Sequence, residues 1–98
     1  MTLNILPSTQ EDLAAGFAFY EQQQSGVGRY FLESLISDID SLAVTAGVHR
    51  KVFGFHRLLA KAFPYAIYYT FDQGTVEIRA VLDCRRNPSA IRQSLQRI

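Results

Sequence analysis

The sequence lacks the features that would assign it to a secreted, membrane or metal-binding class of protein. Its single cysteine, Cys84, excludes a disulfide within the chain, which fits a reducing compartment. No apolar run approaches the ~20 residues that a membrane-spanning helix needs, and no basic-then-apolar signal sequence opens the chain. Cys84 also has no neighbours at the spacing of metal ligands. We therefore expect a soluble cytoplasmic protein without a metal or a cofactor.

The composition is that of one small globular domain. Of the 98 residues, 48% are hydrophobic and 19% are charged, which is too apolar for a disordered chain. A chain of this length can bury roughly two thirds of its unfolded surface. Because no linker, internal repeat or low-complexity tract interrupts it, we expect a single domain over residues 1–98.

Charge is distributed unevenly between the two halves of the chain. Residues 1–48 contain one base and six acids, a net charge of −5, whereas residues 49–98 contain nine bases and three acids, a net charge of +6. Such asymmetry is a hint of a face that binds anions or acidic partners. The alternative is that acids merely solvate the helices and bases the strands.

The first half of the chain predicts a strand and a helical hairpin. Residues 2–6 form a short strand closed by Pro7, and Ser8 with Glu11 matches a capping box that would start a helix. The apolar stripe of this helix is Leu13, Phe17 and Tyr20.

A second helix follows the glycines at positions 26 and 28 and runs to about residue 46. Its apolar positions are Leu32, Leu35, Ile39 and Leu42. Gly47 suits the left-handed residue that ends a helix. The two helices therefore read as an αα-hairpin.

The second half has the period of strands. Val52, Phe53, Phe55 and Leu59 begin a β-like run, and residues 65–71 are almost all aromatic or β-branched, which predicts a central strand buried on both faces. After a turn at residues 72–74, apolar residues occupy alternate positions of a strand with one core side: Val76, Ile78, Ala80 and Leu82.

A short C-terminal helix over residues 89–97 would dock through Ile91 and Leu95. The order of elements indicates an α+β fold. It has an N-terminal strand, an αα-hairpin and an antiparallel three-stranded meander, giving a sheet of three or four strands. The N-terminal strand is expected beside a strand distant in sequence, with one face of the sheet partly open.

With these segments placed, the chain resembles the RelE/ParE toxin superfamily of bacterial toxin–antitoxin systems over almost its full length. The resemblance rests on the FPYAIYY strand, the AVLDCRRNP segment and these positions: Leu6, Tyr20, Phe31, Leu35, Arg57, Pro64, Tyr65, Tyr69, Arg85, Arg86 and Pro88. It implies a small cytoplasmic toxin that is wrapped and neutralised by a cognate antitoxin encoded beside it.

One branch of the superfamily, the RelE-like branch, cuts messenger RNA on the ribosome. Such cleavage needs cations for the developing phosphorane charge and groups that transfer protons. Candidates for this chemistry are His56, Arg57, Arg79, Arg85 and Arg86, and Lys61 joins the four arginines as a candidate for binding a target or an anion.

The proton-transfer group is the weak point of that interpretation. Ala66 stands where many RelE-like members have an arginine after the tyrosine that opens the central strand, and no Tyr, Phe or His follows Asn87. His49 or His56 can substitute only if the fold turns it towards the arginines, whereas a lone histidine beside a strand is more often structural.

The ParE-like branch binds DNA gyrase and is not known to need catalytic residues, so the missing ribonuclease residues favour it. Asp83 and Cys84 stand where a histidine often precedes the arginine pair, which leaves the target open. We therefore keep three hypotheses: a gyrase-binding toxin, a ribosome-dependent endoribonuclease, and a degenerate member that binds a partner without toxicity.

Partners follow from the same resemblance. An acidic antitoxin tail would lie along the basic half of the toxin, while an apolar helix or strand of the antitoxin covers a hydrophobic groove or sheet edge. Without the antitoxin the exposed apolar surface would favour a weak homodimer. No membrane partner is expected.

Three minor interpretations compete with structural ones. Arg85 and Arg86 would favour a Cys84 thiolate, but a small residue ending a strand is the plainer account. Tyrosines in the central strand could stack on bases, although core packing is favoured because they span both strand faces: Tyr65, Tyr68 and Tyr69. Arginines and acids could simply pair across the sheet: Arg57 or Arg79 with Glu77 or Asp83.

Overall fold

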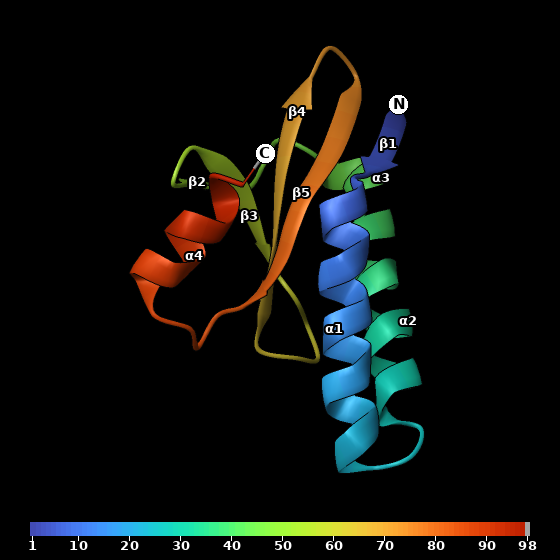
Figure 1. The fold of residues 1–98 in the computed structure, drawn as a ribbon. Coiled ribbons are helices and arrows are strands. Elements are labelled where there is room, and N and C mark those ends of the chain that lie inside the picture. Colours follow the sequence, from blue (N-terminus) through green and yellow to red (C-terminus); the bar gives the residue numbers. More distant parts are fainter. Residues whose placement is uncertain (98) are drawn as a thin grey trace.

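The computed structural model describes residues 1–97 and places a helical hairpin and a short helix on opposite faces of one sheet (Figure 1). Its elements are β1 (Thr2–Ile5), α1 (Pro7–Gln23), α2 (Val27–Asp40), α3 (Leu42–Thr45), β2 (Lys51–Val52), β3 (Phe55–Leu59), β4 (Tyr65–Asp72), β5 (Thr75–Asp83) and α4 (Pro88–Leu95). The predicted α+β layout is confirmed. No helix in the described part of the chain is long and apolar enough to cross a membrane.

The sheet has the strand order β1-β5-β4-β3-β2. The N-terminal strand lies beside a strand distant in sequence, as predicted, and β1 is parallel to β5 while the other pairs are antiparallel. Five strands form where three or four were expected, because the run from Val52 folds back on itself. Phe53 and Gly54 make the tight turn, with φ angles of 55° and 86°, so Phe53 is not a strand residue.

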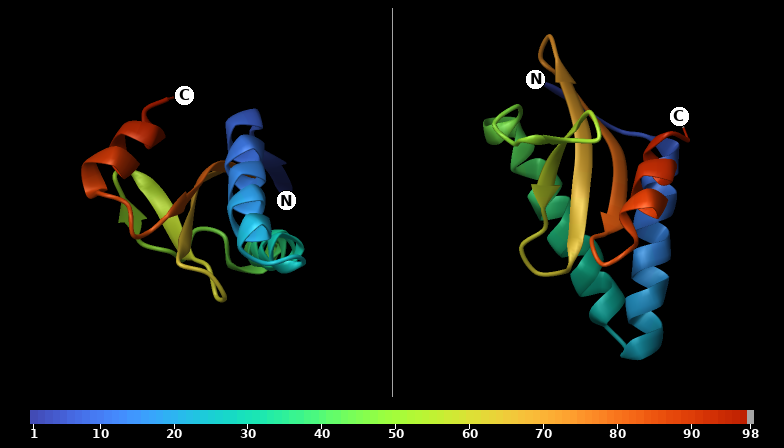
Figure 2. Two further views of the ribbon diagram at one scale, coloured as in Figure 1. Left: turned by 60° about the horizontal axis from the view of Figure 1, so that its bottom comes forward. Right: turned by 90° about the vertical axis from the view of Figure 1, so that its left-hand side faces the viewer.

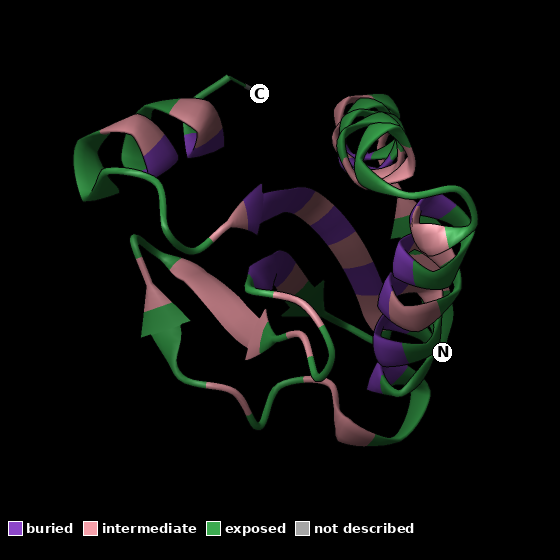
Figure 3. Cartoon of the chain, turned by 90° about the horizontal axis from the view of Figure 1, so that it is seen from below, coloured by how far each residue is buried: buried purple, intermediate pink, exposed green. Residues whose placement is uncertain are grey.

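The hairpin of α1 and α2 covers one face of the sheet and shields the larger core (Figures 2 and 3). Phe31, Leu35 and Ile39 of α2 are fully buried against the inward residues of β4 and β5. Figure 3 shows the buried positions lying where the helices and the sheet face one another. The far half of the hairpin extends beyond the end of the sheet (Figure 1).

A second, smaller core lies between α4 and the other face of the sheet. Ile91 and Leu95 dock α4 as predicted, against Tyr68, Ala80 and Leu82.

The predicted single core side of β5 is wrong beyond residue 78. A register shift opposite Tyr68 and Tyr69 leaves Arg79 as an extra residue in β5. This bulge moves Val81 to the larger core and Ala80 to the smaller one. Both faces of β5 are therefore buried, whereas the alternation predicted a polar working side.

The first helix begins two residues earlier than a capping box at Ser8 would place it, and that capping box does not form. Pro7 takes the first helical position, where its missing N–H costs nothing, and Leu6 precedes it with no side-chain cap. Thr9 uses its hydroxyl instead to donate to the Ile78 carbonyl, at 2.7 Å. The helix ends at Gln23, within the polar run of residues 22–25.

Glu21 fixes the turn of the hairpin. Its carboxylate accepts hydrogen bonds from the backbone N–H groups of Gly26 and Gly28, at 3.0 to 3.1 Å. The second helix is interrupted at Ser41, so it ends as α2 and α3 rather than as one helix to residue 46. Gly47 follows in the left-handed conformation, with φ 91°, as predicted.

Candidate functional site

The smaller-core face of the sheet carries two of the predicted cations. Arg57 on β3 stands opposite Tyr68 on β4, and Tyr68 in turn stands opposite Ala80, which follows Arg79 on β5. Arg79 reaches back towards β3, with its guanidinium carbon 6.0 Å from the centre of the Phe55 ring. Two cations and two aromatic rings thus share this face, beside α4.

Arg79 is held by few polar partners. One terminal nitrogen lies 3.4 Å from a carboxylate oxygen of Glu77, which is the pairing that the sequence suggested. Its buried Nε has no hydrogen-bond partner among residues 1–97. An arginine held over a ring by a single carboxylate keeps part of its donor capacity unused.

Both histidines lie on the other side of the sheet. His56 stacks on Tyr69, with ring centroids 5.0 Å apart, and its Nδ1 donates to the His49 carbonyl at 2.6 Å. Tyr69 is fully buried in the larger core, so His56 points away from Arg57 and Arg79. The fold does not bring these three predicted residues together.

His49 also makes a structural contact, with the Tyr69 hydroxyl. The Tyr69 hydroxyl accepts from the Gly47 N–H at 3.0 Å and forms a second hydrogen bond with Nδ1 of His49. Burial, and secondarily the proximity of His56, lowers the pKa of His49. The imidazole is therefore neutral at neutral pH.

Neither the tyrosine nor the cysteine beside the arginines is prepared for proton transfer or attack. Burial raises the pKa of Tyr68, although Arg57 opposes the shift. Burial likewise raises the pKa of the Cys84 thiol, against the opposing effect of Arg57. Both groups stay protonated near neutral pH, so Tyr68 is a weak base and Cys84 a poor nucleophile.

The remaining predicted cations lie at the lip of the sheet, by which we mean the end where β4 begins and β5 ends. They lie apart from the face that carries Arg57 and Arg79. The Arg85 side chain donates two hydrogen bonds, of 3.0 and 2.7 Å, to the Asp83 carboxylate, and this interaction lowers the pKa of Asp83. Arg86 instead donates to the Ser94 hydroxyl at 3.1 Å. Lys61 is exposed in the loop between β3 and β4, whose backbone is tied to Asp38 of α2.

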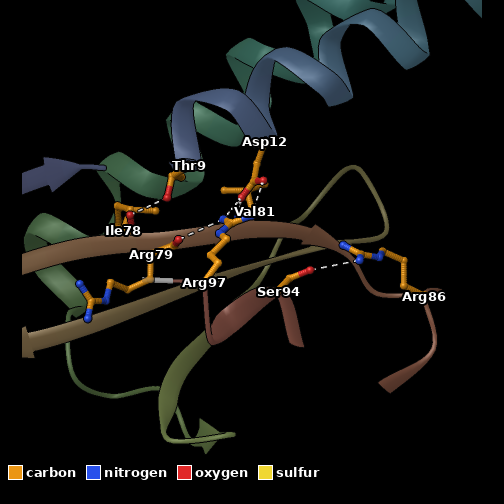
Figure 4. A network of polar contacts seen from close by, with 8 residues as sticks. All are labelled: Thr9, Asp12, Ile78, Arg79, Val81, Arg86, Ser94 and Arg97. Carbon is orange, nitrogen blue, oxygen red and sulfur yellow. Dashed lines mark hydrogen bonds and ion pairs between the residues drawn. The ribbon is translucent and has the colours of Figure 1, made fainter. Parts of the chain in front are cut away.

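A polar network that no sequence pattern predicted joins α1, β5 and residue 97 (Figure 4). Asp12 accepts from the Val81 N–H at 3.0 Å and from two nitrogens of Arg97 at 3.0 and 2.6 Å. Arg97 also reaches the Arg79 carbonyl at 3.3 Å. With Thr9, these side chains cover the edge of β5 beyond its pairing with β1. Asp12 and Arg97 are 85 residues apart, so no local pattern signals their contact.

An apolar groove was missed for a different reason. Leu13 and Phe17, read as parts of one buried stripe, diverge in the fold: Leu13 is buried, whereas Phe17 is only half-buried and faces an open groove. The groove has a volume of about 530 Å³ and is lined mainly by Ile5, Leu13, Ala14, Phe17, Leu32 and Ile36. We call it the hairpin groove. The described residues that line it include no charged or titratable side chain.

Comparison with known proteins identifies the fold. No family model matches the sequence, and no curated protein matches it. A solved structure of the chromosomal ParDE TA system from P. aeruginosa is similar, with a TM-score of 0.74 and 15% sequence identity. The match covers 83% of this chain and 92% of the other. The chain therefore shares the fold of a component of that system.

Proposed function

We propose that this chain is the toxin of a bacterial toxin–antitoxin pair in the RelE/ParE superfamily and that it acts in the ParE-like manner, by binding DNA gyrase in the cytoplasm. The shared fold supports the first part, together with the resemblance carried by Arg57, the FPYAIYY strand and the AVLDCRRNP segment. Its neutralising partner is a cognate antitoxin.

One observation carries the choice of mechanism: the two arginines and the histidines lie on opposite faces of the sheet. Arg57 and Arg79 share one face of the sheet, while His56 packs on Tyr69 on the other. Ribonucleolytic transfer needs a base and an acid within about 3 Å of the reacting oxygens. A surface of arginines without a convergent histidine suits the binding of a protein better than the cutting of a strand.

The hairpin groove is the surface that we assign to the antitoxin. Its apolar lining suits one face of an amphipathic helix. An acidic antitoxin tail would then extend over the sheet and α4, which residues 49–97 build and which hold the basic side chains. Covering this groove would also prevent the weak self-association of the free toxin.

Expression of the chain without its antitoxin tests the proposal. We expect growth arrest in bacteria, relief by co-expressed antitoxin, and inhibition of supercoiling by purified gyrase. Unimpaired growth at confirmed soluble expression would argue for a degenerate binding module.

Primer extension on translated messages separates the second candidate function. Cuts within codons, with gyrase unaffected, would support a RelE-like endoribonuclease that uses Arg57 and Arg79 to hold the phosphate. These two arginines are the observation that keeps this alternative, because they point to the same face.

A further inference from the structure

A second hollow lies on the other side of α1, between that helix and the end of β5. It has a volume of about 220 Å³. Ala15 and Gly16 leave room on the helix side, Val81 and Tyr65 line it from the sheet, and Phe19 and Arg86 stand at its rim. We call it the tip hollow.

An exposed aromatic side chain of the tip hollow packs against a cluster of aromatic rings. Phe19 is 49% exposed, yet its ring lies edge-on to Tyr20 with centroids 5.0 Å apart. Tyr20 in turn packs on Phe63 at 4.8 Å and on Phe31 at 5.2 Å. An exposed aromatic held in this way loses little conformational entropy on binding, as is typical of anchors in protein interfaces.

The charged residues in the lining indicate which kind of ligand the tip hollow would bind. Its lining contains two acids and one base. Each acid already has its own arginine: Arg97 pairs with Asp12 at 2.6 Å, and Arg85 pairs with Asp83 at 2.7 Å. Among residues 1–97, no carboxylate forms an ion pair with Arg86, which holds only the Ser94 hydroxyl. The hollow therefore offers one free positive charge beside an apolar anchor.

The single unpaired cation in the lining also disfavours a nucleic acid. A phosphate backbone carries a negative charge at every nucleotide, whereas the described residues of the hollow offer only Arg86 to balance such charges. A single carboxylate beside an apolar side chain matches the lining better. Such a pair occurs in an acidic segment of a protein.

The tip hollow and the hairpin groove use opposite sides of α1. The residues of α1 that line the hollow are Asp12, Ala15, Gly16 and Phe19, whereas those that line the groove are Gln10, Leu13, Ala14 and Phe17. At 3.6 residues per turn these two sets diverge by about half a turn. A partner in the groove and another at the tip can therefore be recognised by different residues.

We propose that the tip hollow is the docking site for the protein target of the toxin, and that it receives an acidic segment whose apolar side chain packs on Phe19 while a neighbouring carboxylate pairs with Arg86. This assignment rests on the proposed function, since it presumes a protein target. It gives Arg86 a role in recognition and leaves the antitoxin helix in the hairpin groove.

The test compares Phe19→Ala and Arg86→Gln with two matched controls, Phe53→Ala in the β2–β3 turn and Arg92→Gln on α4, which are exposed residues outside the hollow. Thermal melting checks that each variant folds. We expect both hollow variants to need roughly tenfold more protein to inhibit gyrase supercoiling and to arrest growth. Antitoxin affinity should stay within about twofold of wild type, and both controls should behave like wild type.

Other outcomes overturn the assignment in distinguishable ways. Full inhibition and growth arrest by both folded hollow variants would exclude the tip hollow as the target site. An equal loss of antitoxin affinity would reassign it to the antitoxin, and loss of binding to a short DNA duplex would reassign it to nucleic acid. If the wild type arrests growth without affecting gyrase, the proposed target is wrong, while growth arrest by the variants still tests the hollow.

Discussion

At the scale of single residues, the close approach of the two long helices depends on Gly16. A β-carbon built at this position would lie 2.4 Å from the Phe31 ring. Phe31 is 0% exposed and is surrounded by the rings of Tyr20, Phe63 and Tyr65, so it has little room to move aside. The absence of a side chain at residue 16 thus fixes how α1 meets α2.

We predict that Gly16→Ala destabilises the protein. Overpacking a tight core costs about 1–3 kcal/mol, whereas replacing glycine by alanine inside a helix gains at most about 1 kcal/mol. Urea denaturation should therefore show a lower free energy of unfolding, by about 1–2 kcal/mol. Gln22→Ala, at an exposed position of α1, is the control and should change stability by less than about 0.5 kcal/mol. A Gly16→Ala protein as stable as the wild type would mean that the Phe31 ring can move aside to make room for the added methyl group.

At the scale of elements, one tyrosine ties the segment between α3 and β2 to the core. The Tyr69 hydroxyl from β4 holds the backbone of Gly47 and the ring of His49. His56 adds a bond from β3 to the His49 carbonyl. The residues before β2 are thus positioned by a hydrogen-bond chain rather than by strand pairing.

The hydrogen bonds around His49 predict that the free energy of unfolding depends on pH. His49 has a lowered pKa in the folded protein, so the unfolded chain binds more protons as the pH falls below the ordinary histidine value of about 6.5. The stabilisation is present above that value and is lost as the pH falls towards the folded pKa. The urea midpoint should therefore be lower at about pH 5.5 than at about pH 7.5.

The matched variant is His49→Gln, which keeps an acceptor for Tyr69 but does not titrate. Its loss of stability between the same two pH values should be smaller than that of the wild type. An identical pH dependence would assign the effect to other groups, His56 first among them because it lies beside His49.

The elements also show what could be predicted from the sequence. Amphipathic periods located the hairpin, and the aromatic and β-branched run located β4, because both signals are local. The β5 bulge at Arg79 and the cover that Asp12 gives to the Val81 N–H arise from contacts between distant segments. For the same reason the candidate site residues were predicted as a group, while their separation was not: Arg57 and Arg79 lie on one face of the sheet, His56 on the other, and Arg85 and Arg86 at its end.

At the scale of the whole molecule, the charge difference between the halves becomes a difference between layers. Residues 1–48 build β1 and the helices of one side, and residues 49–97 build the rest of the sheet and α4. The halves of the sequence carry net charges of −5 and +6. Opposite faces of the molecule therefore present potentials of opposite sign to an approaching partner.

We predict that salt slows the association of this chain with its antitoxin. Electrostatic attraction guides the acidic tail to the basic layer during association. Salt screens this attraction once the Debye length falls below about 10 Å. Stopped-flow measurements between about 50 and 500 mM salt should show the association rate constant falling by roughly tenfold, with a smaller change in the dissociation rate. A rate that does not depend on salt would contradict a charged antitoxin tail on this layer.

The pairing of β1 with β5 determines the order in which the molecule can be completed as it is synthesised. The α1–α2 hairpin involves only neighbouring segments, so it can form early on the ribosome. The strand before it finds its partner only after residues 75–78 have been made. The tip hollow also needs Val81 and Arg86. The hairpin can thus form before the sheet is complete, whereas the surface that we assign to the target forms only after the last strand has emerged.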